Sequence, residues 1–120
     1  MTKSNLTIES VLDELVTQLK TSEQPLLKIV LFGSYANGTA KEDSDIDLMV
    51  VIDNDDVLKT YDERMKRSLS INRLMRSINY QYALDVLVYS RKELSIVKEF
   101  GNDFINEVEQ TGRVLYEKAS

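Results

Sequence analysis

The sequence predicts a small α/β (α+β) domain in which helices pack on a mainly mixed sheet of three to four strands. Three short apolar runs, rich in β-branched side chains, alternate along the chain with segments of helical periodicity. The chain has 120 residues, of which 42% are hydrophobic, and this is a globular composition with room for one core. It contains no internal repeat, low-complexity tract or linker. We therefore expect one domain over residues 1–120.

The first helix and the first strand come from the N-terminal part of the chain. Thr7 suits an N-cap, and Pro25 marks the junction between the helix and the strand. The nearly continuous apolar run Leu26–Phe32 predicts a buried strand. Apolar residues at i, i+3, i+4, i+7, i+8 and i+11 give the helix one buried face, and they are Ile8, Val11, Leu12, Leu15, Val16 and Leu19.

Two more strands are predicted at Asp45–Ile52 and Ala83–Ser90. Between them, Val57–Ile78 has helical composition, but its apolar stripe drifts around the helix. A bend near Ser68–Ser70 would account for the drift, and we expect the apolar residues to lie in the core. The two stripes are Leu58, Tyr61, Met65 and Leu69, and then Ile71, Leu74, Met75 and Ile78.

The C-terminal part of the chain is predicted to form two helices followed by a short segment. Ser90 and Glu93 fit a capping box, so "RKELSIVKEF" should be helical. Asn102 suits the cap of a last helix that ends at Gly112. The final apolar residues, in 113–117, form either an edge strand or a packed tail.

The composition excludes several kinds of chemistry. There is no cysteine and no histidine, so disulfides, thiolate catalysis, the usual general base and the usual transition-metal ligand are missing. Acid–base or metal chemistry must rest on carboxylates, hydroxyls, lysines and tyrosines, and carboxylates favour hard cations such as Mg²⁺. A net charge of −5 argues against direct binding of a long nucleic acid, but is compatible with a nucleotide neutralised by metal.

Signals for membrane insertion and secretion are missing from the sequence. No apolar run approaches roughly eighteen residues, so we expect no transmembrane helix and no membrane contact. The first ten residues lack the apolar stretch of a signal peptide. The default expectation is a cytoplasmic protein.

Two carboxylates, Asp45 and Asp47, stand two positions apart at the start of the second predicted strand. Strand side chains alternate, so both should point to one face, and Asp85 can converge with them if its strand is a neighbour. Two charges about 6 Å apart repel by roughly 2.5–3 kcal/mol at an effective dielectric of about 20. Divalent cations would offset this repulsion, and a pair of them suits a phosphoryl or nucleotidyl displacement.

A purely structural interpretation of these carboxylates is also open. Asp45 can be a strand-entry residue and Asp47 a solvent-facing one, because acidic residues are common at strand ends. Asp85 is harder to explain in this way, since it interrupts an apolar strand where a buried charge is costly unless it is paired. A salt bridge and a functional role are equally compatible with Asp85.

Gly33 and Ser34 directly follow the first predicted strand. Glycine lets the backbone approach a phosphate closely, and Ser34 offers a hydroxyl and an amide. If a short helix begins at Ser34, its amides would form an anion site. Taken alone, a plain turn is the simpler explanation of the pair.

Together these motifs resemble the nucleotidyltransferase fold of the DNA polymerase beta superfamily. In that superfamily an apolar residue, a glycine and a glycine or serine form a turn. Two carboxylates separated by one residue follow the turn, and a third carboxylate comes later in the chain. The three parts here are Phe32–Ser34, Asp45–Asp47 and Asp85. The longer string G-S-Y-A-x-G-x-A-x-x-x-S-D-I-D-L is similar to the minimal nucleotidyltransferase (MNT) family, and the resemblance covers nearly the whole chain, including its tail. The string is matched by Gly33, Ser34, Tyr35, Ala36, Gly38, Ala40, Ser44, Asp45, Ile46, Asp47 and Leu48.

The resemblance implies roles for the matching residues. Asp45 and Asp47 would ligate two Mg²⁺ ions, and Asp85 would ligate the catalytic metal and help to deprotonate the acceptor hydroxyl. Gly33 and Ser34 would hold the triphosphate of ATP, which is the expected substrate.

One departure from the family concerns the residue after the alanine of this string. The family usually has arginine there, whereas this chain has Asn37, and Lys41 is the candidate replacement for the missing cation. The residues expected to bind the nucleotide are Gly33, Ser34, Asn37, Lys41 and Ser44.

The resemblance also implies a function, namely a Mg²⁺-dependent transfer of AMP from ATP to a hydroxyl group. Larger relatives carry a second domain for the acceptor, and a chain of this length leaves no room for one, so the acceptor is expected on another chain. Minimal nucleotidyltransferases are commonly antitoxins encoded beside a HEPN-domain ribonuclease toxin, and they transfer AMP to a tyrosine of that toxin. This is the leading expectation, with a homo-oligomer or hetero-oligomer as the assembly.

Two other functions are compatible with the same sequence. One is an antitoxin of this fold that blocks its toxin by contact alone, which Asn37 favours and the three carboxylates oppose. The other is a nucleotidyltransferase that acts on a small molecule such as an antibiotic, with a neighbouring copy completing the site.

A basic cluster stands out in this acidic chain. A solvated helix face is the ordinary explanation of such a cluster, and a contact surface for nucleotide phosphates or for an acidic partner is the alternative. The cluster consists of Arg64, Lys66, Arg67, Arg73 and Arg76.

Overall fold

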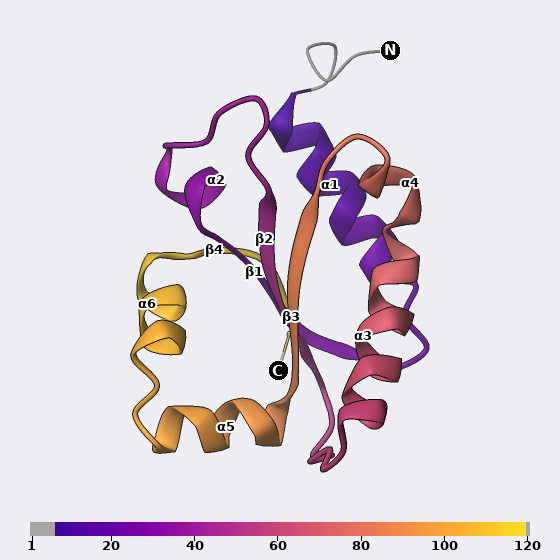
Figure 1. The fold of residues 1–120 in the computed structure, drawn as a ribbon, viewed down its shortest axis with the longest axis vertical. Helices are drawn as coiled ribbons and strands as arrows, with labels where there is room; N and C mark the ends of the chain where they lie inside the picture. Colours follow the sequence, from indigo (N-terminus) through magenta and orange to yellow (C-terminus); the bar gives the residue numbers. More distant parts are fainter. Residues whose placement is uncertain (1–6, 120) are drawn as a thin grey trace.

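The structure is a computed structural model that describes residues 7–119. Within this range four strands form one mixed sheet in the order β3-β2-β1-β4 (Figure 1). β1 pairs antiparallel with β2 and with β4, whereas β2 and β3 run parallel. The predicted mixed sheet is therefore confirmed, with strands β1 (Leu26–Phe32), β2 (Ile46–Ile52), β3 (Leu84–Ser90) and β4 (Arg113–Glu117).

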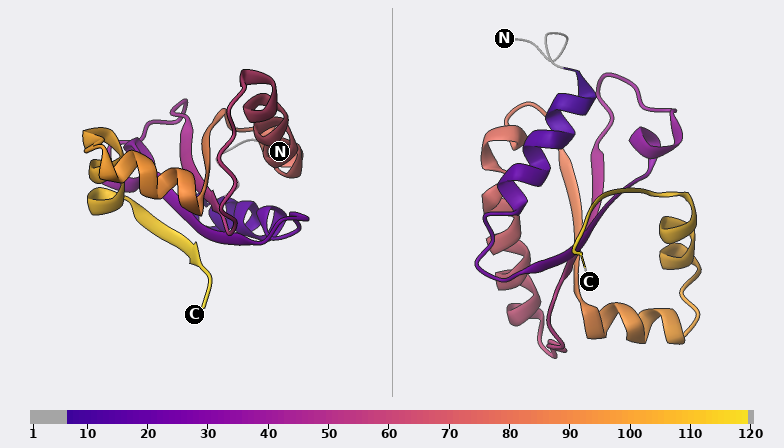
Figure 2. Two further views of the ribbon diagram at one scale, coloured as in Figure 1. Left: turned by 90° about the horizontal axis from the view of Figure 1, so that it is seen from below. Right: turned by 180° about the vertical axis from the view of Figure 1, so that it is seen from behind.

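Helices cover both faces of the sheet, as Figures 1 and 2 show: α1 and α3 lie on one side of the strands, and α5 and α6 on the other. The short helix α2 follows β1, and α4 follows α3. None of the helices between residues 7 and 119 is long and apolar enough to cross a membrane. The helices are α1 (Ile8–Leu19), α2 (Ser34–Asn37), α3 (Tyr61–Leu74), α4 (Arg76–Asn79), α5 (Arg91–Glu99) and α6 (Asp103–Thr111).

Strand β2 supplies side chains to two separate cores. Leu48 and Val50 are fully buried with residues of α1 and α3, while Met49 and Val51 are fully buried with residues of α5 and α6. Because side chains alternate along a strand, Asp47 belongs to the face of Met49 and Val51. The carboxylate thus lies on the side of the sheet that α5 and α6 cover.

Most of the predicted helix ends are confirmed by capping contacts. The Thr7 side chain accepts a hydrogen bond from the Ser10 amide at the start of α1. Ser90 and Glu93 form the predicted capping box of α5, although the helix ends at Glu99, one residue early. The segment after α6, for which two structures were open, is the edge strand β4, because it pairs with β1.

The helix predicted at Val57–Ile78 has other limits than expected. It begins at Tyr61, where Thr60 forms a capping box with Glu63. The expected bend near Ser68–Ser70 is wrong, because α3 continues to Leu74 and the break lies at Met75. Turning the chain at this later point lets Ile71 of α3 and Ile78 of α4 both reach the core that α1 shares with the sheet.

The first apolar stripe of this segment is also placed differently. It was predicted to be core, but the side chains of Tyr61, Met65 and Leu69 are 66%, 39% and 47% exposed, whereas Ile71 and Met75 are buried. A helix at the edge of a sheet can bury only one stripe. In α3 that stripe is the second one, and the first faces outward.

Candidate functional site

The parallel pairing of β2 and β3 places Asp47 directly beside Asp85. On its other side Asp47 lies opposite Phe32, the last residue of β1. Neighbouring strands are about 4.8 Å apart, so the two carboxylates start from adjacent backbone positions. The structure therefore brings together two of the three carboxylates singled out in the sequence.

Asp45 precedes β2 by one residue and adds a third negative charge near the pair. Burial raises the pKa of Asp47, and the charges of Asp85 and Asp45 raise it further. None of the ion pairs among residues 7–119 involves any of these three aspartates. The charges thus repel one another without a protein cation in the described part of the chain to balance them.

Asp85 does not interrupt a buried strand, and the prediction that it does is wrong. β3 is an edge strand, and Asp85 is exposed, so its charge remains in water. Asp45 is exposed as well, whereas Asp47 is half-buried. Asp85 is exposed, so it does not need a buried partner, and the described residues offer it no salt bridge. Neither burial nor ion pairing therefore explains why it lies beside Asp47.

The donor chemistry of the three aspartates fits Mg²⁺, which prefers carboxylate oxygens. In the part of the chain that the structure describes, no three acidic side chains are grouped closely enough to enclose a metal ion. Asp45 and Asp85 are exposed, so their side chains have room to turn toward Asp47. A cation there would stabilise the Asp47 carboxylate, whose pKa is raised by burial and by the charges of Asp85 and Asp45.

Gly33 joins β1 to α2 and presses its backbone against Asp47. Its φ of 74° is in the left-handed region, which glycine adopts without strain. A Cβ atom built on Gly33 would lie 2.1 Å from Asp47 Oδ2. Only glycine fits this position, and it sets the start of α2 beside the carboxylates.

A short helix begins at Ser34, as the anion-site interpretation of the Gly-Ser turn required. The Ala36 amide is the first of α2 to bond back to the Gly33 carbonyl. The amides of Ser34 and Tyr35 precede it and therefore have no helical acceptor. They stand next to Gly33, and through it next to Asp47.

The other residues expected to bind the nucleotide are partly engaged with one another. Asn37 Oδ1 accepts hydrogen bonds from the amide and the hydroxyl of Thr39, at 3.1 and 2.6 Å. Ser44 Oγ accepts a hydrogen bond from the Lys41 amide at 2.8 Å, which closes the turn before β2. The Lys41 side chain is exposed. Ser44 thus has a structural role in this turn. The side-chain nitrogen of Asn37 takes no part in the contacts with Thr39, so it can still donate hydrogen bonds.

Helix α6 contributes a wall to the site that the sequence motifs did not indicate. A cavity of about 140 Å³ separates it from the Gly-Ser turn and α2. The rings of Phe32 and Phe104 meet edge to face across its floor, with centroids 5.6 Å apart. One signal was available: Phe104 lies off the buried Ile105/Val108 stripe of α6. The cavity is lined by Phe32, Gly33, Ala36, Asn37, Phe104, Glu107, Val108 and Thr111.

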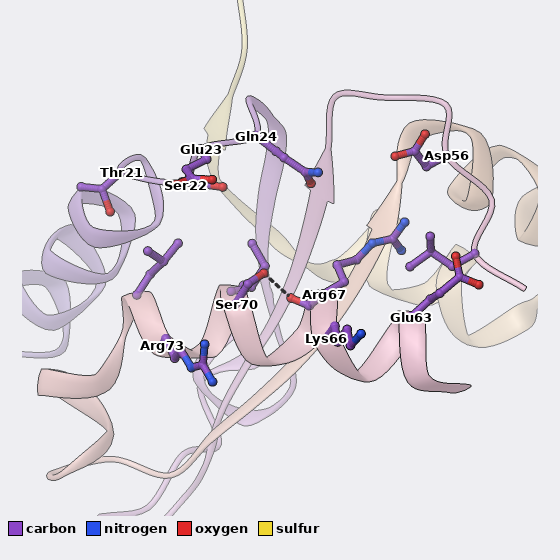
Figure 3. A pocket seen from close by; sticks show the side chains of 13 residues that line it. Thr21, Ser22, Glu23, Gln24, Asp56, Glu63, Lys66, Arg67, Ser70 and Arg73 are labelled. Carbon is purple, nitrogen blue, oxygen red and sulfur yellow. Dashed lines mark hydrogen bonds between the residues drawn. The ribbon is translucent and has the colours of Figure 1, made fainter. Parts of the chain in front are cut away.

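A larger cavity, of about 740 Å³, lies away from the carboxylates, between α3 and the connection from α1 to β1 (Figure 3). Lys66, Arg67 and Arg73 of the basic cluster line it. Arg67 is mostly buried and pairs with Glu93 at 2.5 Å, so it holds α3 to α5. The cluster belongs to α3 and α4, and among residues 7–119 none of its members forms an ion pair with Asp45, Asp47 or Asp85.

Comparisons with known sequences agree with this geometry. The family model described as a nucleotidyltransferase domain matches residues 12–118. A protein of Methanocaldococcus jannaschii that carries the name of a protein adenylyltransferase is 32% identical over 111 residues, which are 90% of this chain and 97% of that protein. Another protein of that organism with the same kind of name is 31% identical over 96 residues, and this match spans 74% of the chain but only 59% of the relative.

Solved structures show the same fold. A nucleotidyltransferase structure from Sulfolobus solfataricus has a TM-score of 0.60 at 20% identity and covers 91% of this chain and 79% of that one. A crystal structure of a toxin–antitoxin with AMP-PNP has a TM-score of 0.59 at 22% identity, covering 89% of this chain and 73% of that one. The overall fold is therefore shared with these proteins.

Proposed function

Because the chain belongs to the nucleotidyltransferase domain family, whose model matches residues 12–118, we propose that it transfers AMP from ATP to a hydroxyl group in a Mg²⁺-dependent reaction. The observation that carries this proposal is the contact between two motifs. Asp47 and Asp85 are neighbours in the sheet, and Gly33 packs directly on Asp47. The carboxylates proposed to bind a divalent cation thus lie beside the turn proposed to bind the phosphates.

The metal site would consist of Asp45, Asp47 and Asp85, and two Mg²⁺ ions are the expected occupants. Bound Mg²⁺ would supply Lewis-acid stabilisation of the charge that develops on the phosphate oxygens. The raised pKa of Asp47, which comes first from burial and then from the charges of Asp85 and Asp45, supports this assignment, because a cation favours the ionised carboxylates.

The Gly-Ser turn would bind the triphosphate. Gly33 has no side chain to obstruct a phosphate, and the amides of Ser34 and Tyr35 have no helical acceptor. The Ser34 hydroxyl adds a further donor. These groups would hold the β- and γ-phosphates in place while the α-phosphorus reacts.

Asp85 would accept the proton of the acceptor hydroxyl. It is exposed on the edge strand β3, where an acceptor from another molecule can reach it, and the chain has no histidine to take this role. The acceptor oxygen forms a bond to the α-phosphorus as the bond to the bridging oxygen breaks. Pyrophosphate leaves, and the proton of the hydroxyl passes to the Asp85 carboxylate.

For the acceptor we propose a tyrosine of a partner protein, namely a HEPN-domain ribonuclease toxin that this chain neutralises as its cytoplasmic antitoxin. Two sequence relatives carry the name of protein adenylyltransferases, which supports a protein acceptor. Two of the structural neighbours come from toxin–antitoxin structures, and one of these was crystallised with an ATP analogue.

The decisive experiment mixes this protein with the toxin encoded beside it, in the presence of Mg²⁺ and ATP. We expect mass spectrometry to find the mass of one AMP, or a multiple of it, on a toxin tyrosine. Because the covalent product persists after the two proteins separate, a substoichiometric amount of this protein should inactivate all the toxin. Asp85→Asn should lower the rate of transfer by orders of magnitude while nucleotide binding persists.

Contact inhibition is the competing function, and Asn37 in place of the family's arginine favours it. It predicts inhibition mole for mole without ATP, no gain of mass on the toxin, and no effect of Asp45→Asn. That set of results would contradict the enzymatic proposal. Transfer of AMP to a small molecule with the toxin unmodified would contradict the proposed acceptor but not the chemistry.

A further inference from the structure

We propose that the cavity between α2 and α6 binds the base of the nucleotide, and that Glu107 and Asn37 select bases with an amino group beside a ring nitrogen, as in adenine. This inference rests on the proposed function, because it concerns the same nucleotide. It assigns roles to Phe104 and Glu107, two residues of the tail to which the resemblance gave no role.

The position of the cavity follows from Gly33, which has two neighbours. A Cβ built on Gly33 would meet Asp47 Oδ2, and Gly33 also lines the cavity. A nucleotide whose β- and γ-phosphates lie on the Gly-Ser turn carries its base one α-phosphate and one ribose away. The cavity next to the same glycine is therefore within reach of the base.

The aromatic floor suits a flat ring. Phe32 and Phe104 meet edge to face, with an interplanar angle of 84°, an arrangement in which a ring face is left uncovered. Phe104 is 48% exposed although it is a large apolar side chain. Stacking of a base on such a ring is favourable and tolerates any base, so Phe104 contributes affinity without selecting among bases.

Selection comes from one acceptor and one donor on opposite walls. Glu107 is exposed at the cavity and takes part in none of the ion pairs among residues 7–119, and its ionised carboxylate accepts hydrogen bonds but cannot donate them. Across the cavity, Asn37 Oδ1 is bonded to Thr39, which leaves the Nδ2 donors of Asn37 for a ligand.

Adenine offers the complementary pattern, an amino donor next to a ring nitrogen that accepts. Hypoxanthine, the base of ITP, presents a carbonyl oxygen in place of the amino group, and the Glu107 carboxylate would repel that oxygen. Asn37, which departs from the family's arginine, would then contact the base rather than the phosphates.

Calorimetric titrations in Mg²⁺ buffer with ATP, ITP and tripolyphosphate test this assignment. We expect the wild-type protein to bind ATP at least about tenfold more tightly than ITP, which is within the discrimination that a paired donor and acceptor provide. Glu107→Gln should remove most of this preference, because glutamine both donates and accepts. The matched control is Glu109→Gln, the same change on the same helix at a residue that pairs with Lys98, and it should keep the preference.

Two further measurements separate the base site from the rest of the nucleotide site. Phe104→Ala should weaken ATP and ITP to a similar extent and leave their ratio unchanged. Tripolyphosphate, which has no base, should bind the wild type and all variants alike.

The inference is overturned if the wild type binds ATP and ITP equally, or if Glu107→Gln leaves their ratio intact. It is also overturned if Glu107→Gln changes only the KM of the acceptor, because the cavity would then serve the acceptor. Binding of tripolyphosphate without base preference would leave the proposed function standing. If none of the three probes binds, the proposed function is wrong as well.

Discussion

Asp47 lies between Phe32 and Asp85 in the sheet, and burial together with the charges of Asp85 and Asp45 raises its pKa. A carboxyl whose pKa is raised in the folded state destabilises the fold above that pKa, where it is ionised. The loss of stability fades as the pH falls through the raised pKa and the group becomes protonated. The site therefore weakens the fold at neutral pH unless a cation is bound.

The upward shift of the Asp47 pKa leads to a prediction for Asp47→Asn. Without divalent metal at pH 7, the variant should melt at a higher temperature than the wild type, because the repulsion is removed. The difference should shrink as the pH is lowered and Asp47 of the wild type becomes neutral. Thermal melts followed by circular dichroism across a pH series would measure it, with exposed Asp43→Asn as the control. A less stable Asp47→Asn protein at pH 7 would contradict the electrostatic account.

Gly33 provides a second prediction, with Gly38 as its matched control. Both glycines have a positive φ, but Gly38 (ψ 12°) is in the left-handed helical region, where alanine costs about 1–2 kcal/mol, whereas Gly33 (ψ −153°) is in a region almost confined to glycine, where the cost is about 1–3 kcal/mol. Only at Gly33 would the new Cβ collide with Asp47, since Gly38 has open space around it. Gly33→Ala should therefore cost more stability in chemical unfolding and should abolish tripolyphosphate binding, which Gly38→Ala should preserve. Equal effects of the two changes would place the turn away from Asp47.

At the scale of the element, helix α3 has one buried face and one exposed face. Ile71 is 2% exposed, in the core with α1, whereas Leu69 two residues earlier is 47% exposed. The sequence contains two similar apolar stripes. At this edge of the sheet only the second packs into the core, and the first stays exposed. Arg67, mostly buried, joins α3 to Glu93 of α5.

The orientation of α3 can be tested with two substitutions. Ile71→Ala should lower the free energy of unfolding by about 2–5 kcal/mol, as is usual for a buried isoleucine. Leu69→Ala should change it by no more than about 0.5 kcal/mol, because the side chain already faces water. Urea unfolding of both variants measures the difference, and a large effect of Leu69→Ala would mean that this face is covered in solution.

At the scale of the whole molecule, the site joins four separate segments: the end of β1, the start of β2, the edge strand β3 and helix α6. The elements that bring them together are bound to one another through two cores on opposite faces of the sheet. A ligand that requires all four segments should bind only the folded chain and stabilise all of it.

Mg²⁺ and ATP together should therefore raise the melting temperature. A ligand at about one hundred times its Kd adds about 2.7 kcal/mol to the stability of the state it binds. The double substitution Asp45→Asn with Asp47→Asn should remove this response without lowering the stability of the metal-free protein. Differential scanning fluorimetry with and without Mg²⁺–ATP measures both, and a wild type that ignores millimolar Mg²⁺–ATP would contradict the proposed site.

The sequence by itself determined the elements that depend on neighbouring residues. The capping residues Thr7, Ser90 and Asn102 marked helix starts that the structure confirms, and the three apolar runs marked strands to within one residue. These features follow from backbone periodicity and from hydrogen bonds over three or four positions, so a short stretch of sequence is enough to predict them. The Gly-Ser turn and the D-x-D pair were visible for the same reason.

Only the tertiary structure decided which distant residues meet. The order β3-β2-β1-β4 leaves Asp85 exposed on an edge strand and sets it beside Asp47, and the path of α6 brings Phe104 and Glu107 to the Gly-Ser turn. The outward turn of Tyr61, Met65 and Leu69 was decided in the same way. Strand order and helix packing depend on which apolar faces bury one another across the molecule, and local periodicity carries no information about that choice.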